Sequence, residues 1–370
     1  MHQVAITIIG GGVVGLALAY ELSDMGKAQV VLLEKNEKFG QEVSSHNSEV
    51  IHCGIYYPKD SLKARLCVEG RRLLYDFSDR YAIPCRKLGK FIVASHGEEL
   101  PRLRSFYEKG LENEVEGLSF LDARQCRHLE PCVNAEAAIL SAETGIIDSH
   151  VLMKRLYHLC RNRHVIMVFK AFLSHLETCN EGYSVGVNDD SYRFRSRIVI
   201  NASGLGSDAV LSLLGLNIDE LGYKLVFVKG NYFAYHGQSP VSRLIYPLPH
   251  HDLKGLGVHA TLDFGGRLRF GPDTEFIESV NYDVNIQKKP EFIESASKMI
   301  RGLDPHAFEP DMAGVRPKLA ASGFRDFVIK CERDKGFPNF INLVGIESPG
   351  LTSVLAIAKE VKKIVNQIEA

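Results

Sequence analysis

The first 34 residues alternate between short apolar runs and a glycine-rich turn. Val4–Ile9 is a run of mostly β-branched residues, typical of a strand buried on both faces, and Gln29–Glu34 is a second apolar run. Between them, the apolar positions from Val13 to about Met25 predict a helix, which Gly26 is placed to end. The order strand, helix, strand predicts a parallel pair of strands joined by a right-handed crossover.

The rest of the chain extends both patterns. Helical spacing of apolar residues predicts helices at 61–81, 100–109, 123–129, 151–160, 292–300 and 351–368. Alternating or continuous apolar runs predict strands at 90–94, 165–169, 183–187, 192–194, 198–202, 224–235, 255–261, 267–271 and 340–345. Segment 39–57 has no clear period and is rich in Gly, Ser, His, Asn and Tyr, which favours a long functional loop.

The distribution of these elements predicts two domains of an α/β protein. The chain has 370 residues, which suits about two domains. Helices and strands alternate toward both ends, whereas 223–276 is mostly strand. We therefore predict a Rossmann-like nucleotide-binding domain and a second domain around a mostly antiparallel β-sheet that binds the substrate. The first is assigned to 1–80, 145–215 and 315–370, and the second to 81–144 and 216–314.

Charge and hydropathy exclude several functions. The formal net charge is −1, and no basic run is interleaved with aromatic residues, so nucleic-acid binding is not expected. The apolar stretch 4–18 lacks a basic flank and is interrupted by glycines, so it is not a signal peptide. No run of about 18 apolar residues occurs elsewhere, so no transmembrane helix is expected. Peripheral contact with the inner face of a membrane stays open.

The cysteines and histidines do not suggest a metal site. The 8 cysteines are scattered without a C-x-x-C pair, so neither zinc nor a redox dithiol is indicated. In a long chain without a secretion signal they are typical of reduced thiols in a cytoplasmic protein. The segment His250-His251-Asp252 favours a Pro-rich turn, because the side chains of adjacent residues point apart.

The first chemical motif is Gly10-x-Gly12-x-x-Gly15, placed directly after the first strand and at the start of the helix. Gly10 permits the tight turn, Gly12 lets the backbone approach a pyrophosphate, and Gly15 lets helix and strand pack closely. The helix N-terminus offers N–H groups and a positive dipole end to the phosphates. Glu34 ends the second strand, where a carboxylate can accept hydrogen bonds from ribose hydroxyls.

Two further glycine turns favour FAD over NAD as the cofactor. Asn201-Ala-Ser-Gly204-Leu-Gly206 and Gly345-Ile-Glu-Ser-Pro-Gly350-Leu-Thr352 each follow a predicted strand and lead into a helix. Turns at several strand ends suit a large cofactor lying across the carboxyl edge of a sheet. The C-terminal turn can direct a helix N-terminus at the flavin ring and stabilise its reduced anion.

A longer set of motifs resembles a known family. The loop Ser45-His46-Asn47-Ser48-Glu49-Val50-Ile51-His52-Cys53-Gly54-Ile55-Tyr56-Tyr57 is the most specific of them. Together with Leu88-Gly89-Lys90, Thr144-Gly145-Ile-Ile-Asp148, Ile245-Tyr246-Pro247, Leu256-Gly257-Val258-His259, Leu268-Arg269-Phe270-Gly271-Pro272 and Ala313-Gly314-Val315-Arg316, it resembles the L-2-hydroxyglutarate dehydrogenase/oxidase family. That family belongs to the D-amino acid oxidase-like flavoproteins. Residues 346–353 and Val228-Lys229-Gly230-Asn231 depart from its pattern.

The resemblance implies FAD as cofactor and oxidation of a small 2-hydroxy acid, with L-2-hydroxyglutarate giving 2-oxoglutarate. We expect the FAD to be bound non-covalently, because nothing in the sequence marks a flavin-linking residue. It extends over nearly the whole chain, and we assign the cofactor contacts residue by residue. The predicted cofactor-binding residues are Gly10, Gly12, Gly15, Glu34, Lys35, Ser45, His46, Asn47, Ser48, Val168, Ala202, Gly204, Gly345, Gly350, Leu351 and Thr352.

Oxidation of a 2-hydroxy acid moves the Cα hydrogen to flavin N5 as hydride, and needs a base for the hydroxyl proton and a cation for the carboxylate. The candidate bases are His52 and His259, because histidine titrates near neutrality. Arg316 is the candidate anchor for the carboxylate. Further candidates are Lys63, Arg65 and Lys90 as alternative anchors and Tyr56, Tyr57 and Tyr246 as hydrogen-bond partners of substrate oxygens.

Two other functions stay open at this point. One is an amine oxidase of the glycine or sarcosine oxidase type, which needs no dedicated base if the neutral amine binds. The other is an FAD-binding partner subunit that is not itself the catalyst. The sequence also leaves open whether oxygen, a quinone or another carrier accepts the electrons.

Overall fold

The computed structural model describes residues 2–25, 28–249, 257–320 and 323–370. Its helices are α1 (Val13–Leu22), α2 (Leu62–Tyr81), α3 (Leu100–Glu112), α4 (Ala123–Leu129), α5 (Ser149–Asn162), α6 (Ser207–Leu213), α7 (Lys289–Met299) and α8 (Gly350–Glu369). The predicted helix stop at Gly26, the segment His250-His251-Asp252 and the start of the predicted strand 255–261 lie outside the described residues.

A largely parallel sheet forms the centre of the first layer. Its order is β10 (Leu173–Cys179), β11 (Gly182–Val187), β12 (Tyr192–Asn201), β1 (Gln3–Ile9), β2 (Val30–Leu33) and β9 (Ile166–Val168), with β20 (Phe340–Val344) beside β12 and β19 (Val328–Cys331) beside β20. The predicted strands 192–194 and 198–202 are one strand, because β12 pairs first with β11 and then with β20. Strands β1 and β2 are parallel, as the motif order predicted.

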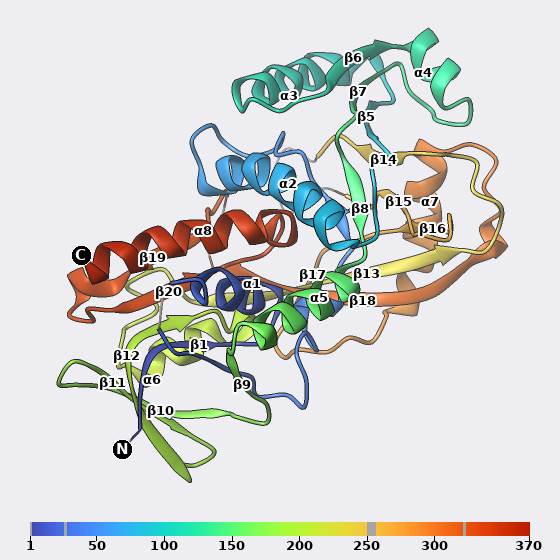
Figure 1. Cartoon of the computed structure of the whole chain (residues 1–370). Helices are drawn as coiled ribbons and strands as arrows, with labels where there is room; N and C mark the ends of the chain where they lie inside the picture. The colour runs from blue at the N-terminus through green and yellow to red at the C-terminus, as the bar shows by residue number, and fades with distance from the viewer. Residues whose placement is uncertain (1, 26–27, 250–256, 321–322) are drawn as a thin grey trace.

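Helices α1, α2, α5 and α8 cover one face of this sheet, as Figure 1 shows. Helix α1 is apolar along nearly its whole length because the sheet, α5 and α8 enclose it. Helix α2 begins after Ser61, whose hydroxyl accepts a hydrogen bond from the Ala64 N–H. Helix α6 and strand β10 contribute to a second core on the opposite face. The sheet is therefore covered on both sides, which suits its continuous apolar strands.

A second, mostly antiparallel sheet lies beside the first layer. Its order is β17 (Glu275–Ile277), β13 (Leu225–Tyr235), β16 (Leu268–Phe270), β15 (Ala260–Leu262), β14 (Leu244–Pro247), β5 (Lys90–Ala94), β7 (Ala137–Ser141) and β6 (Leu118–Asp122), and β18 (Phe308–Leu319) also pairs with β13. A third, small antiparallel sheet has the order β3 (Val50–Ile51), β8 (Gly145–Ile147) and β4 (Cys85–Arg86). The fold is α/β with a second, mostly antiparallel sheet, as predicted.

Strand β18 was missed in the sequence because polar residues interrupt its apolar pattern. It pairs with β13 from Phe308 to Leu319, with a register shift where Tyr232 gives way to Phe233. The predicted domain boundary at residue 315 falls inside this strand, and the division of the chain into domains stays a prediction. Among the described residues, no helix combines the length and the apolar character that crossing a membrane requires.

Helices α2 and α8 approach each other closely at Gly70. A Cβ atom added there would lie 2.5 Å from the backbone oxygen of Thr352 and 2.6 Å from the Cα of Ser353. Glycine therefore lets α2 dock against the N-terminal turn of α8, the turn that the sequence assigns to the flavin.

We expect Gly70→Ala to lower the free energy of unfolding by about 1–3 kcal/mol, because the added methyl group overpacks this contact. In an exposed helix the same change would stabilise by about 1 kcal/mol. Urea unfolding of Gly70→Ala and of Gly97→Ala, where the new Cβ would meet no atom within 4 Å, measures the effect. Equal stability of the two variants would contradict the steric account.

Candidate active site

A cavity of about 670 Å³ extends from the carboxyl edge of the parallel sheet to the second sheet. This volume is typical of a small-molecule or cofactor site. The turn before α1, the loop 40–48 and α6 line its first part, and β13, β18 and the turn before α8 line its second part. The predicted site residues that line it are Gly10, Gly12, Glu34, Lys35, His46, Asn47, Ser48, His52, Ala202, Gly204, His259, Arg316, Gly350, Leu351 and Thr352.

The nucleotide end of the cavity is built around Glu34, which is 6% exposed. One carboxylate oxygen accepts the Gly11 N–H at 2.7 Å and the other accepts the Asn36 N–H at 2.8 Å. Each oxygen keeps a further lone pair for a ribose hydroxyl. The Val13 N–H at the start of α1 donates to the Ser44 hydroxyl at 2.9 Å, so the loop closes over the helix N-terminus. This donor set and cradle fit an adenosine diphosphate moiety.

Four predicted cofactor residues do not line the cavity but support it. A Cβ at Gly15 would lie 1.9 Å from the Gly10 oxygen, so this glycine permits the helix–strand packing that the motif predicted. The Val168 carbonyl accepts the Glu34 N–H at 2.9 Å, and thus fixes the backbone that presents the carboxylate. The Ser45 hydroxyl bonds to the Gly40 carbonyl, and Gly345 has a φ of 69° in the turn after β20.

Sequence reasoning missed several residues of the same cavity. Ser44, next to the predicted Ser45, contacts α1, and the segment 171–174 lines the cavity beside Glu34. Tyr232 and Gly230 reach it from alternate positions of β13. The alternation in that strand was the available signal, but it could not show which face meets the cofactor.

Two histidines lie in the second part of the cavity. His52 follows β3, and its backbone N–H donates to the Thr352 hydroxyl at 3.0 Å. Its Nε2 lies 3.4 Å from the Ser348 hydroxyl, and within the described part of the chain its buried Nδ1 has no hydrogen-bond partner. Burial, with the charges of Lys90 and His259, lowers the pKa of His52 well below its ordinary value of 6.5.

His259 is the more enclosed of the two and is 4% exposed. Its Nδ1 lies 2.9 Å from the Gly257 carbonyl, which can only accept a hydrogen bond, so the proton of the neutral ring is on Nδ1 and Nε2 is the basic atom. The ring stacks on Tyr246, with centroids 3.8 Å apart. Burial lowers the pKa of His259 to about 3, although the bond to Gly257 opposes this, and Lys90 and Arg316 lower it further.

Arg316 brings a cation to the cavity from β18. Its Nη2 donates to the Asp273 carbonyl at 2.8 Å, and its Nε lies 3.4 Å from the Val228 carbonyl. Carbonyl groups hold the guanidinium in place without neutralising its charge. The geometry leaves it able to pair with an anion in the cavity.

The other predicted anchors lie away from the cavity lining. Lys63 is buried in an ion pair with Glu347 at 2.9 Å, whereas Arg65 is half-exposed and faces Glu360 at 3.4 Å. Lys90 is fully buried, with its Nζ 4.8 Å from the Tyr246 ring centroid and 4.9 Å from that of Tyr56.

Tyr246 also stands behind the cavity wall, where it stacks on His259 and lies over Lys90. Its hydroxyl is buried, as is that of Tyr56, and neither finds a hydrogen-bond partner among the residues described. Burial raises the pKa of both hydroxyls, so both stay protonated. Tyr57 is likewise absent from the cavity lining. The tyrosines support the site from behind, and the predicted hydrogen bonds from them to substrate oxygens stay untested.

Comparison with known proteins places the chain in context. A family model described as FAD-dependent oxidoreductase (DAO) matches residues 5–364. The mitochondrial L-2-hydroxyglutarate dehydrogenase of Arabidopsis thaliana is 36% identical over 407 residues, which covers 97% of this chain and 83% of that protein. The Caenorhabditis elegans protein of the same name is 31% identical and covers 96% and 91%.

Solved structures show the same architecture. The dithionite-reduced L-alpha-glycerophosphate oxidase of Mycoplasma pneumoniae with FAD bound has a TM-score of 0.88 and 26% identity, covering 99% of this chain and 95% of that one. Glycine oxidase from Geobacillus kaustophilus has a TM-score of 0.81 with the same coverage but only 17% identity. The second likeness shows a shared fold alone.

The neutral state of His259 makes a testable contribution to stability. The unfolded chain takes up a proton on this residue near pH 6.5, whereas the folded chain does so only near pH 3. The unfolded state therefore binds more protons between these values, and stability is lost as the pH falls through this window, by at most about 1.4 kcal/mol per pH unit.

We expect His259→Asn, which can still donate to Gly257, to show a shallower loss of stability than the wild type between pH 6.5 and 4.5. Urea unfolding at several pH values measures the slope. His128→Asn, at an exposed position, is the control. Parallel slopes for wild type and His259→Asn would contradict the assignment of a neutral, buried imidazole.

Proposed function

Because the chain belongs to the family of FAD-dependent oxidoreductases, we propose that it oxidises L-2-hydroxyglutarate to 2-oxoglutarate. The two relatives described above, both named L-2-hydroxyglutarate dehydrogenase, support this substrate. They match nearly the whole chain, at 36% and 31% identity. The observation that carries the proposal is the meeting of two neutral histidines and Arg316 in one cavity.

This arrangement meets the needs of a 2-hydroxy acid. The flavin, when bound, accepts the hydride from the substrate Cα. Arg316 would pair with the C1 carboxylate and so fix the orientation of the Cα–H bond. A histidine would take the hydroxyl proton, and both candidates are neutral at pH 7. His259 offers Nε2, and its ring is fixed by Gly257 and Tyr246. His52 lies on the cofactor side, bonded to Thr352.

A second cation on β18 favours a dicarboxylate. Lys318 follows Arg316 by two residues, so both side chains leave the same face of the strand, with Cα atoms about 6.5–7 Å apart. Lys318 does not itself line the cavity, but its Nζ lies 3.9 Å from Glu347, a residue that lines the cavity and already pairs with Lys63. Burial lowers the pKa of Lys318, and Arg316 and Lys63 lower it further although Glu347 opposes them. The second carboxylate of a dicarboxylate substrate would relieve the repulsion of Lys318 by Arg316 and Lys63.

The proposal includes an external electron acceptor, which the family chemistry requires and whose identity stays open among oxygen, a quinone and another carrier. A cytoplasmic location stays a prediction from the sequence.

Anaerobic flavin bleaching tests the substrate. We expect L-2-hydroxyglutarate to bleach the flavin absorbance of the FAD-loaded protein, while the D enantiomer, glycine and sarcosine leave it unchanged. Bleaching by amines alone would overturn the proposal in favour of an amine oxidase. Bleaching by none of these acids in a protein that retains FAD would favour a non-catalytic partner subunit.

The dicarboxylate assignment predicts a selective effect of Lys318→Met. We expect the KM for L-2-hydroxyglutarate to rise about three- to tenfold, because one ion pair to the substrate is lost. The KM for L-2-hydroxybutyrate, which lacks the second carboxylate, should stay the same. Lys298→Met, at an exposed lysine that pairs with Glu294, is the control. An equal change for both substrates would contradict the role of Lys318.

A further inference from the structure

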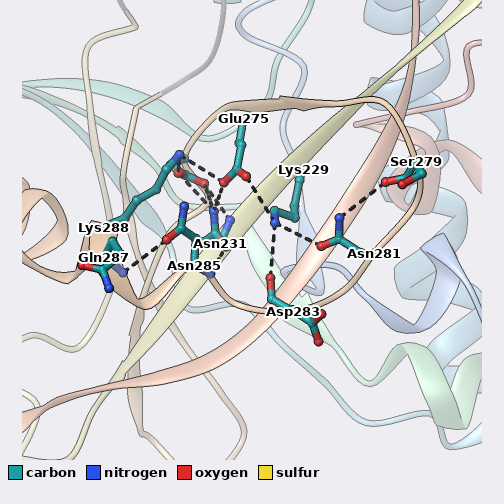
Figure 2. Close-up of polar contacts among 10 residues, drawn as sticks. Lys229, Asn231, Glu275, Ser279, Asn281, Asp283, Asn285, Gln287 and Lys288 are labelled. Atoms are coloured by element: carbon teal, nitrogen blue, oxygen red, sulfur yellow. Dashed lines mark hydrogen bonds and ion pairs between the residues drawn. The ribbon is translucent and has the colours of Figure 1, made fainter.

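Residues 272–288, here called the strap, run from the end of β16 to α7 and contact the loop 40–48, here called the cofactor loop. The strap contains β17, which pairs with Phe227, Val228 and Lys229 of β13, and Pro272 at its start lines the cavity. Figure 2 shows a network of polar contacts between the strap and β13. The network involves Lys229 and Asn231, which belong to the segment 228–231 that departs from the family pattern described above.

Asn231 is the centre of this network and is fully buried. Its Nδ2 donates to both carboxylate oxygens of Asp273, at 3.0 and 3.2 Å, and to Glu275 at 3.1 Å. Its Oδ1 accepts the Asn285 N–H at 2.8 Å. The amide therefore binds both the start and the end of the strap, and its donor and acceptor ends are not interchangeable.

Two lysines balance the carboxylates of the network. Lys229, 5% exposed, donates to Asn281 at 3.1 Å and to the Asp283 carbonyl at 3.3 Å, and it pairs with Glu275 at 3.3 Å. Lys288 pairs with Asp273 at 2.5 Å and with Glu275 at 3.3 Å. The two cations and two carboxylates leave no net charge, so a further carboxylate at this place would be unbalanced.

The strap contacts both parts of the site. At one end, the Asp273 carbonyl accepts the Arg316 guanidinium at 2.8 Å. At the other, Tyr282 stacks on His46, with ring centroids 4.0 Å apart, and His46 lines the cavity in the cofactor loop. His46 also packs closely against Gly314 of β18, where a Cβ atom would lie 2.3 Å from the backbone oxygen of His46.

We propose that the strap is a positioning element in which Asn231 fixes the segment, Asp273 directs Arg316 at the substrate carboxylate, and Tyr282 holds the cofactor loop at His46. The part that concerns Arg316 rests on the function proposed above. The part that concerns His46 depends only on FAD binding.

The first experiment changes Asn231 while keeping its shape. Asn231→Asp replaces the Nδ2 donor with a carboxylate oxygen that faces Asp273 and Glu275, so it repels the strap. We expect the FAD-loaded variant to show about a tenfold higher KM for L-2-hydroxyglutarate, with kcat within about twofold of the wild type. The double variant Asn231→Asp/Asp273→Asn exchanges carboxylate and amide, and should recover the KM to within about threefold.

Two further variants keep this experiment decisive. Lys288→Met removes two ion pairs from the less buried side of the network, and should raise the KM by about threefold if Asn231→Asp does not fold. Asn217→Asp, an exposed asparagine outside the strap, is the matched control. A folded, FAD-loaded Asn231→Asp with an unchanged KM, or an exchange variant that does not recover, would overturn the positioning of Arg316.

The second experiment needs no substrate. Tyr282→Leu removes the stacking on His46, and we expect FAD to bind about tenfold more weakly, as measured by the flavin fluorescence released on dilution. Tyr282→Phe keeps the ring and should restore binding, and Tyr192→Leu, at a half-exposed tyrosine of β12, is the control. If the wild type does not oxidise L-2-hydroxyglutarate, the proposed function fails, and the strap is still judged here. Unchanged FAD affinity of Tyr282→Leu would refute it.

Discussion

The antiparallel pairing of β13 with β18 determines the geometry of the reactive end of the cavity. In this register Val228 pairs with Arg316, and Gly230 pairs with Gly314. The guanidinium, the strap contacts and the glycine against which His46 packs therefore all lie on one pair of strands. Because side chains alternate along a strand, a slip of one residue would turn Arg316 to the other face. The position of the cation is therefore a property of the whole ladder, which the register shift at Tyr232 leaves intact around Arg316.

Burial and ion pairing determine which groups near these two strands carry a charge. Arg316 is held by carbonyl groups, whereas the acid groups of the neighbourhood are used elsewhere, Glu347 by Lys63 and Asp273 by Lys288. Burial is the main reason that the pKa values of His52 and His259 are low; the charge of Lys90 lowers both further, and that of Arg316 lowers the pKa of His259. The proton acceptors are thus kept neutral mainly by burial, while the cation that can pair with a carboxylate lies in the same cavity.

The sequence predicted the parts of this site that depend on local pattern. The turn Gly10–Gly15, the carboxylate of Glu34 and the two long helices α2 and α8 follow from spacing and capping within short segments. It did not show that Tyr246 and Lys90 stand behind the wall, because inward and outward faces of a strand look alike when both are buried. It also missed β18 and the strap. The contacts of the strap join residues far apart in the sequence: Asn231 and Asp273 are 42 positions apart, and His46 and Tyr282 are 236 positions apart.

The central claim is that Arg316 and the neutral histidines bind one 2-hydroxy acid in a single cavity. The most direct measurement is a crystal structure of the FAD-loaded protein with the product, 2-oxoglutarate. The account predicts the C1 carboxylate against the Arg316 guanidinium and the 2-oxo oxygen within hydrogen-bond distance of a ring nitrogen of His52 or His259. A product bound outside the cavity, or within it but turned away from Arg316, would contradict the account.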